Sequence, residues 1–317
     1  MEESEGNVDV LGFRLFYRSF GAPEAGTVLC LHGGPGATHD YLLPLAGLAP
    51  FGYRVVLYDQ LGCGKSELPR DTSLFTIDRG IEEVEGVRRG LGLGTVHLMG
   101  SSYGGALAIA YALKYQRNLR SLVITGGLAS VPLTVAEMQR LKSELPAGVQ
   151  SVLQKYEAIE DYENPEYLAA VREFYNRYLC RLPEWPKEVT YALEHISRPV
   201  YLTMNGPNEF TIIGNIKDWD VTDQLPRIRV PTLITVGKYD EVTPKVARSI
   251  QRGIQGSKLI VFENSSHLAM WEERERYLGV VRRFLATVDG ARPPRRARRP
   301  PPRSRPAATA HGRKRTR

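Results

Sequence analysis

The sequence predicts an α/β protein with a mostly parallel sheet, helices on both faces of that sheet, and an inserted helical lid. Three observations carry this prediction. Strand-like runs alternate with helical periodicity over residues 1–130, the pattern becomes helical over 131–220, and the alternation resumes over 221–289. A chain of 317 residues is long enough to bury a large core and still carry such an insertion.

The first part of the predicted core, residues 1–130, alternates between strands and helices. Apolar residues recur at helical spacing over 77–91, and 105–113 is a second helix-like run. Because parallel strands need a crossover connection, this alternation favours parallel pairing. Six short runs have the composition of strands: 7–10, 14–20, 27–31, 55–58, 95–99 and 121–125.

Residues 131–220 form the predicted lid. Helical periodicity dominates there, with tyrosines, tryptophans and scattered prolines. Asn164 followed by Pro165 predicts the start of a helix over about 166–180, because asparagine caps a helix well and proline suits its first position.

The alternation resumes over 221–289, with strands at 230–236 and 258–262 and a last helix over about 272–287.

Residues 290–317 contain six prolines, ten arginines and one lysine but no acidic residue. This composition predicts a disordered basic tail, which is either merely solvated or binds nucleic acid or another polyanion weakly. Since the whole chain has a net charge of +7, the predicted folded part carries −4.

Composition excludes several classes of protein. No apolar run reaches the ~18 residues of a membrane helix, and the acidic start, Met1–Gly6, does not resemble a secretory signal. The cysteines, Cys30, Cys63 and Cys180, have neither metal-site spacing nor a disulfide framework, which suits a reducing cytoplasm. We therefore expect a cytoplasmic protein without membrane contact, metal or other cofactor.

The most informative motif is Gly100-Ser101-Ser102-Tyr103-Gly104, which matches G-x-S-x-G. A strand-like run precedes it and a helix-like run follows it. A serine on such a strand-to-helix turn has its hydroxyl exposed at the carboxyl edge of a parallel sheet. Only Ser102 has glycine two residues away on both sides, so Ser102 is the predicted nucleophile.

A serine nucleophile needs a base and a carboxylate that orients the base, in the chain order Ser, Asp or Glu, His. Among six histidines, only His267 follows a late strand within a polar turn, so it is the predicted base. The loop after the preceding strand supplies Asp240 and Glu241 as candidate acids. Asp240 is the better one, because it lies nearer the strand end and its side chain is short.

Acyl transfer also needs backbone donors for the oxyanion. The glycine-rich segment His32–Gly36 follows an early strand, and we assign the amides of Gly34 and Tyr103 as the two donors. His32 is expected to brace this segment. A second segment, Gly62–Ser66, ends like a phosphate-binding loop, but it lacks the first glycine of that motif, so nucleotide binding is not expected.

Together, the segments 32–36, 59–64 and 100–105 with Asp240 and His267 resemble the proline iminopeptidase family, which comprises serine aminopeptidases with the α/β-hydrolase fold. The resemblance spans about residues 8–287. The resemblance is specific, because the combination of H-G-G-P-G with D-Q-x-G-C-G is matched by far fewer proteins than G-x-S-x-G alone.

Three further segments, 204–210, 239–244 and 266–271, look like the tricorn-interacting aminopeptidase subgroup. The resemblance implies release of an N-terminal residue, often proline, from short peptides with a free N-terminus, with a larger upstream protease as a possible source. It also implies that two acidic side chains, Glu209 and Glu241, capture the free α-amino group. The physics agrees, because paired carboxylates in a closed site attract a cation strongly.

Two other functions stay open at this point. An esterase or amidase on the same fold would act on small neutral substrates, for which Glu209 and Glu241 would have no partner. A binding protein on this fold would not need an intact nucleophile, base and acid, yet all three candidates are present.

Overall fold

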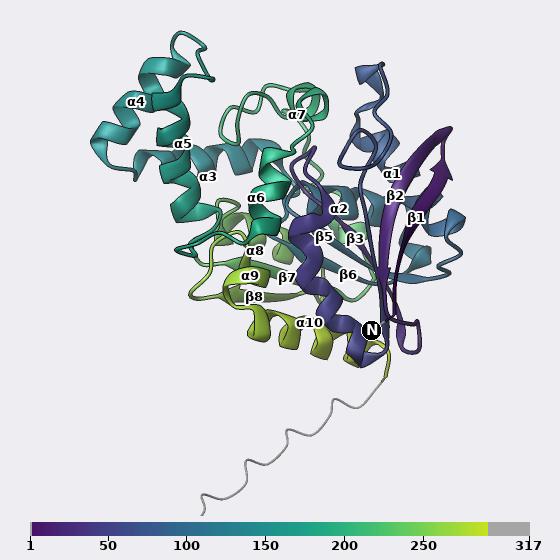
Figure 1. The fold of residues 1–317 in the computed structure, drawn as a ribbon. Helices are drawn as coiled ribbons and strands as arrows, with labels where there is room; N and C mark the ends of the chain where they lie inside the picture. Colours follow the sequence, from purple (N-terminus) through teal and green to yellow (C-terminus); the bar gives the residue numbers. More distant parts are fainter. Residues whose placement is uncertain (1, 291–317) are drawn as a thin grey trace, which may run out of the picture.

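The computed structural model describes residues 2–290, so the predicted tail lies outside the described residues apart from Gly290. The described part contains one eight-stranded sheet in the order β1-β2-β4-β3-β5-β6-β7-β8 (Figure 1). β1 and β2 pair antiparallel, as do β2 and β4, and the other pairs are parallel. The strands are β1 (Glu3–Val10), β2 (Phe13–Phe20), β3 (Gly26–Leu31), β4 (Tyr53–Tyr58), β5 (Val96–Ser101), β6 (Leu119–Thr125), β7 (Thr232–Gly237) and β8 (Lys258–Phe262).

Helices cover both faces of this sheet. One apolar core lies under α1, α2 and α8, and the second lies under the 3₁₀ helix η1 and α10. The helices are η1 (His39–Phe51), α1 (Ile77–Gly90), α2 (Tyr103–Tyr115), α3 (Val131–Ser143), α4 (Ala147–Glu157), α5 (Pro165–Tyr178), α6 (Lys187–Glu194), α7 (Arg198–Met204), α8 (Pro244–Gly253), α9 (Ala269–Glu272) and α10 (Arg274–Val288). Short 3₁₀ turns lie at Thr72–Leu74, Gln116–Asn118 and Leu225–Arg227. Because both faces are covered, β3, β5 and β7 are almost entirely buried and consist mainly of apolar residues.

The predicted elements are present, with differences that have physical causes. The first strand begins at Glu3 instead of Asn7, because its polar residues pair as an edge strand with β2 across the tight turn at Leu11–Gly12. Neither η1, which contains two prolines, nor α8 was predicted. Asn164 caps α5 as expected and accepts a hydrogen bond from the amide of Glu166 at 3.1 Å.

The five helices α3–α7 lie between β6 and β7 in sequence, and Figure 1 shows them above the sheet. We call them the helical insertion. Its two ends meet, because Ser130 and Asp220 form an antiparallel bridge and the Ser130 hydroxyl donates to Asp220 at 2.6 Å. The predicted boundaries after residues 130 and 220 fall at this bridge and stay predictions.

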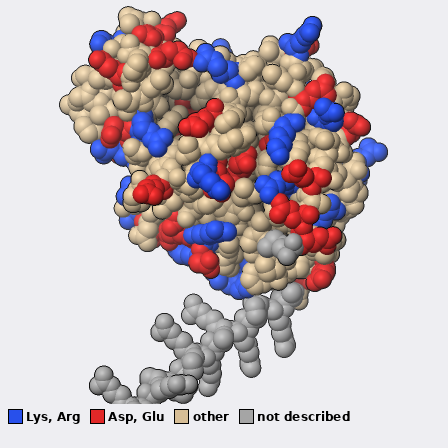
Figure 2. All heavy atoms as spheres, viewed as in Figure 1, with Lys and Arg blue, Asp and Glu red and all other residues tan. Residues whose placement is uncertain are grey.

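Charges on the folded part are well mixed. Figure 2 shows basic and acidic side chains interspersed over the viewed face, which agrees with the small negative net charge of the part outside the tail. None of the helices within residues 2–290 combines the length and apolar composition needed to cross a bilayer.

A buried ion cluster fixes the end of α10 at the amino edge of the sheet. Asp289 contacts Arg120 at 2.6 Å and His97 at 3.3 Å, and it accepts a hydrogen bond from the Tyr53 hydroxyl at 2.9 Å. The side chain of Asp289 is only 7% exposed. This carboxylate therefore joins β4, β5, β6 and the last helix.

Replacing Asp289 should destabilise the protein. We expect Asp289→Ala to lower the free energy of unfolding by about 2 kcal/mol, because it leaves the Tyr53 hydroxyl and Arg120 without their buried partner. Urea denaturation measures this. The exposed Glu275 on the same helix supplies the control, since Glu275→Ala should change stability by less than about 0.5 kcal/mol. Equal effects of the two variants would contradict the role of the cluster.

Candidate active site

Ser102 occupies a strained turn between β5 and α2. Its backbone has φ 57° and ψ −127°, a conformation that a residue with a side chain rarely adopts. A Cβ at Gly100 would lie 2.0 Å from the carbonyl oxygen of Gly104, and a Cβ at Gly104 would lie 2.3 Å from that of Leu31. Glycine at both positions therefore lets the first turn of α2 press against the ends of β5 and β3, which leaves Ser102 at the tip of the turn.

His267 and Asp240 form a buried pair at the carboxyl ends of β8 and β7. The Nδ1 atom of His267 lies 2.7 Å from Oδ1 of Asp240, which also accepts a hydrogen bond from the amide of Val242 at 2.8 Å. The Glu241 carboxylate approaches the other imidazole nitrogen, Nε2, only to 3.9 Å. Between the two candidate acids, Asp240 thus has the geometry that orients the imidazole.

The two predicted oxyanion donors belong to segments at the site, because Gly34 lines the same cavity as Ser102 and Tyr103 directly follows Ser102. Gly34 has φ 108°, and a Cβ there would meet the amides of Gly36 and Ala37 at 2.6 and 2.7 Å, so this tight turn requires glycine. Tyr103 is the first residue of α2, where amides have no partner within the helix. Within residues 2–290, neither the Gly34 nor the Tyr103 amide donates a hydrogen bond to the protein.

The other two motif residues, His32 and Asp59, hold the loops around this turn. The ring of His32 accepts a hydrogen bond from the Gln60 amide at 3.0 Å, and the Gln60 side chain donates to the His32 carbonyl at 2.7 Å. Asp59 accepts hydrogen bonds from the amides of His39 and Lys65 at 2.8 and 2.9 Å. His32 therefore braces the loop after β3, as the sequence predicts.

Glu209 and Glu241 line the same cavity as Ser102, Gly34 and His267. This cavity contains about 510 Å³ of empty space, part of it open to solvent. Glu241 is 2% exposed. Tyr201, a residue that the sequence did not single out, donates a hydrogen bond from its hydroxyl to Glu209 at 2.7 Å.

These acidic groups dominate the electrostatics of the cavity. Burial raises the pKa of both Glu209 and Glu241, and Glu209 raises that of Glu241 further. Burial alone lowers the pKa of His267, but the charges of Asp240, Glu241 and Glu209 outweigh it and raise this pKa to about 9. The protonation states of Glu209, Glu241 and His267 therefore depend on one another, and a cation bound beside the two carboxylates would change all three.

The end of helix α5 contacts both loops of the site, which sequence reasoning missed. The carbonyl oxygen of Tyr178 accepts hydrogen bonds from the amides of Glu241 and His267 at 3.2 and 3.1 Å, and that of Leu179 accepts one from Leu268 at 3.2 Å. These carbonyls belong to the last turn of α5 or follow it, where helices leave carbonyl groups without an internal partner. The helical insertion is thus bonded directly to the loops that carry the base and Glu241.

Glu272 in α9 is a second residue that the sequence did not indicate. Its carboxylate accepts hydrogen bonds from the amide and hydroxyl of Ser266 at 2.7 and 2.8 Å, and from the amide of Arg181 at 2.6 Å. Since Ser266 directly precedes His267, Glu272 fixes the turn from which the imidazole projects. Within residues 2–290, no group of three or more His, Cys, Asp and Glu side chains is arranged to hold a metal ion.

Comparisons with known proteins identify the family of the chain. Residues 26–274 match the family model for the alpha/beta hydrolase fold. A proline iminopeptidase of Saccharolobus solfataricus is 54% identical over 287 residues, which are 90% of this chain and 93% of the relative. The chain belongs to the proline iminopeptidase family.

Solved structures support this family and confirm the predicted fold class. A proline iminopeptidase of Mycobacterium smegmatis is 34% identical with a TM-score of 0.84, and VinJ is 39% identical with a TM-score of 0.87. Each comparison covers 90% of this chain and 99% of the solved chain. The similarity therefore extends over nearly the whole length of both solved chains.

Removing the charge of Glu241 should lower the pKa of His267. We expect Glu241→Gln to move this pKa from about 9 towards the ordinary value of about 6.5, because a negative charge that favours the imidazolium is lost. NMR titration of the histidine rings measures the shift. Glu263→Gln, at an exposed position in the same loop region, should leave the pKa of His267 unchanged. An unchanged or higher pKa in Glu241→Gln would contradict the electrostatic account.

Proposed function

We propose that this protein is a serine aminopeptidase that hydrolyses the bond after the N-terminal residue, often proline, of short peptides. The observation that carries this proposal is the pair Glu209 and Glu241. Glu241 is buried and Glu209 is half-buried, and both line the cavity that contains Ser102 and His267. The proline iminopeptidases among its relatives support it.

In the proposed reaction, Ser102 attacks the carbonyl carbon of the first residue and His267 takes the proton from the serine hydroxyl. Asp240 orients the imidazole and stabilises its charged form. The amides of Gly34 and Tyr103 donate to the oxyanion, where a helix N-terminus adds favourable potential. His267 then protonates the leaving amine, and a water molecule, deprotonated by His267, hydrolyses the acyl-enzyme and releases Ser102.

The substrate ammonium group has a second effect in this proposal. A cation placed between Glu209 and Glu241 offsets the negative charges that hold the pKa of His267 at about 9. The pKa of the imidazole then falls, and the neutral form that serves as base becomes more populated at neutral pH. Binding of the correct substrate thus prepares the base for its first step.

An esterase or amidase that acts on neutral substrates fits this site less well. A neutral group would leave Glu209 and Glu241 desolvated without a counter-charge, which is unfavourable by several kcal/mol. The same argument extends to peptides with a blocked N-terminus. The carboxylate pair therefore favours a substrate with a free amino group.

The proposal assigns the helical insertion, residues 131–220, the role of a lid that restricts entry to short, extended peptides. A larger upstream protease as the source of these peptides is part of the proposal. Weak binding of nucleic acid through residues 290–317 is a separate proposal that concerns residues outside those described.

Blocking the amino group of the substrate should abolish activity selectively. We expect kcat/KM for a proline arylamide to exceed that for its N-acetyl analogue by about a thousandfold or more, because the analogue leaves buried charges unpaired. Hydrolysis of the two arylamides by the purified protein measures this ratio. Equal rates would contradict the aminopeptidase proposal and favour an amidase.

Two variants accompany this measurement. Ser102→Ala should show no turnover of either substrate while its circular dichroism stays unchanged. Glu209→Gln should reduce kcat/KM for the free substrate much more than for the blocked one, whereas the exposed Glu263→Gln should have no effect on either.

A further inference from the structure

The cavity around Ser102 has two sides with different linings. One side contains His267 and Leu268 together with Val189, Leu193 and Ile196 of the helical insertion. A second, adjoining space of about 440 Å³ contains Tyr103 and Val242 but not His267. Ser102, Gly34 and Glu209 line both. The reacting serine therefore lies at the junction of two pockets.

The chemistry of the proposed reaction assigns a role to each side. The general acid must lie next to the nitrogen that leaves, so the leaving peptide extends into the side that contains His267. In this orientation, the α-carbon of the first residue carries its carbonyl group towards Gly34 and its ammonium group towards Glu209 and Glu241. Its side chain is then directed into the remaining space, where Tyr103 and Val242 lie.

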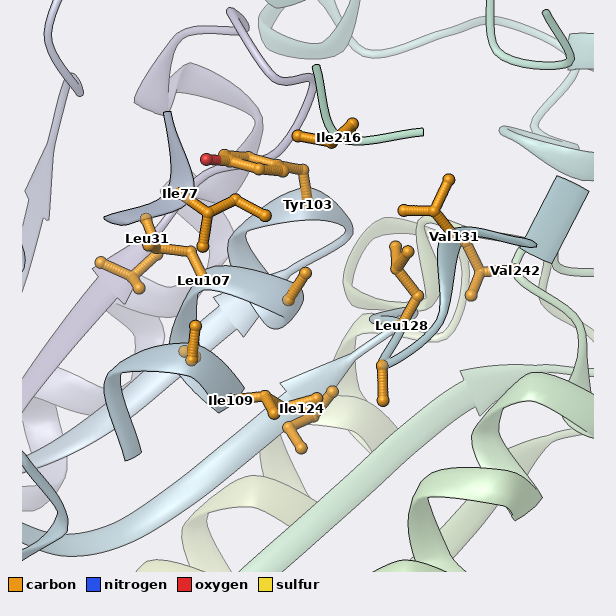
Figure 3. Packing of buried hydrophobic residues seen from close by; sticks show 14 of the residues in the cluster. Leu31, Ile77, Tyr103, Leu107, Ile109, Ile124, Leu128, Val131, Ile216 and Val242 are labelled. Atoms are coloured by element: carbon orange, nitrogen blue, oxygen red, sulfur yellow. The ribbon is translucent and has the colours of Figure 1, made fainter. Parts of the chain in front are cut away.

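This second space, which adjoins Tyr103 and Val242, is lined mainly by apolar side chains. Its lining includes Ile77 of α1, Tyr103 of α2, Leu128 of the segment after β6, Val131 of α3 and Val242 of the loop after β7. Figure 3 shows these side chains in the apolar core. Met138 of α3 also contributes to the lining of the second space. In this assignment, the second space binds the side chain of the first substrate residue. The part of the cavity that contains His267 then remains for the second residue.

We propose that the side lined by α6 binds the second residue of the peptide and selects an apolar side chain there; this rests on the proposed function. Val189, Ala192 and Leu193 of α6 recur at the three- and four-residue spacing that places side chains on one face of a helix, and Ile196 lies two residues beyond the end of this helix. All four line the cavity. Helix α6 thus presents an apolar stripe to the leaving group.

The surroundings of this stripe strengthen the assignment. Leu179 and Leu268 face the same space from the end of α5 and from the residue after His267. The charged side chains that line this side are Glu209, Glu241 and His267, which the proposed reaction already occupies. A second residue that is charged would therefore lose its hydration without gaining a partner.

The second subsite is also tied to the base. Leu268 donates its backbone amide to the Leu179 carbonyl at 3.2 Å, while the preceding His267 donates to the Tyr178 carbonyl at 3.1 Å. The same two hydrogen bonds to the end of α5 thus hold both Leu268, which contacts the second residue, and His267, which protonates its nitrogen. A good fit of the second side chain should raise kcat as well as lower KM.

The test compares three substrates with the same first residue, Pro-Leu-amide, Pro-Gly-amide and Pro-Asp-amide. We expect the unmodified protein to hydrolyse Pro-Leu-amide with a kcat/KM about tenfold or more above that for Pro-Gly-amide, and the aspartate substrate to be the poorest. A Leu-to-Gly ratio near one would overturn the proposal, and this measurement needs no variant.

Two variants separate the two sides. Leu193→Ala should lower the Leu-to-Gly ratio at the second position at least about threefold and leave the preference for the first residue unchanged. Met138→Ala should do the opposite, changing the ratio between proline and alanine arylamides. If both variants change both ratios equally, α6 does not select the second residue. If none of the free substrates is hydrolysed by the unmodified protein, the proposed function itself fails.

Discussion

The close contact between the first turn of α2 and the end of β3 is the constraint on which the site depends. Only hydrogen fits where the α-carbon of Gly104 meets the carbonyl of Leu31, and this contact holds the nucleophile turn against the loop that contains Gly34. Ser102 and the amides assigned to the oxyanion therefore belong to one backbone unit. Side-chain adjustments cannot separate them, and preorganised donors of this kind need little rearrangement when charge develops.

A second property of the fold is the concentration of acid around one imidazole. Asp240, Glu241 and Glu209 gather near the buried His267, and this concentration of negative charge is unfavourable without a cation beside it. The packing of the surrounding sheet and helices offsets this unfavourable electrostatic free energy. In the proposed function, the ammonium group of the substrate relieves this repulsion, so the carboxylates favour a substrate with a free amino group.

Much of this could be predicted from sequence because it follows from local order. A glycine-flanked serine between a strand and a helix, a histidine after a late strand and an acid after the strand before it are visible in one dimension. The importance of Glu209 came from the family resemblance, since nothing local distinguishes a carboxylate in a long helical segment. Tyr201, Glu272 and the carbonyl of Tyr178 could not be predicted, because their partners come from distant segments or backbone atoms without a sequence signature. The proposed role of α6 lies between these cases. The spacing of its apolar residues can be recognised in the sequence, but the cavity that they line cannot.

The shared carbonyl of Tyr178 makes the position of the helical insertion and that of the two loops depend on each other. Because one oxygen binds the amides of both Glu241 and His267, displacement of the end of α5 would release the two loops together. The end of α5 and the two catalytic loops therefore keep their positions together, and any change that orders one of them favours order in the other.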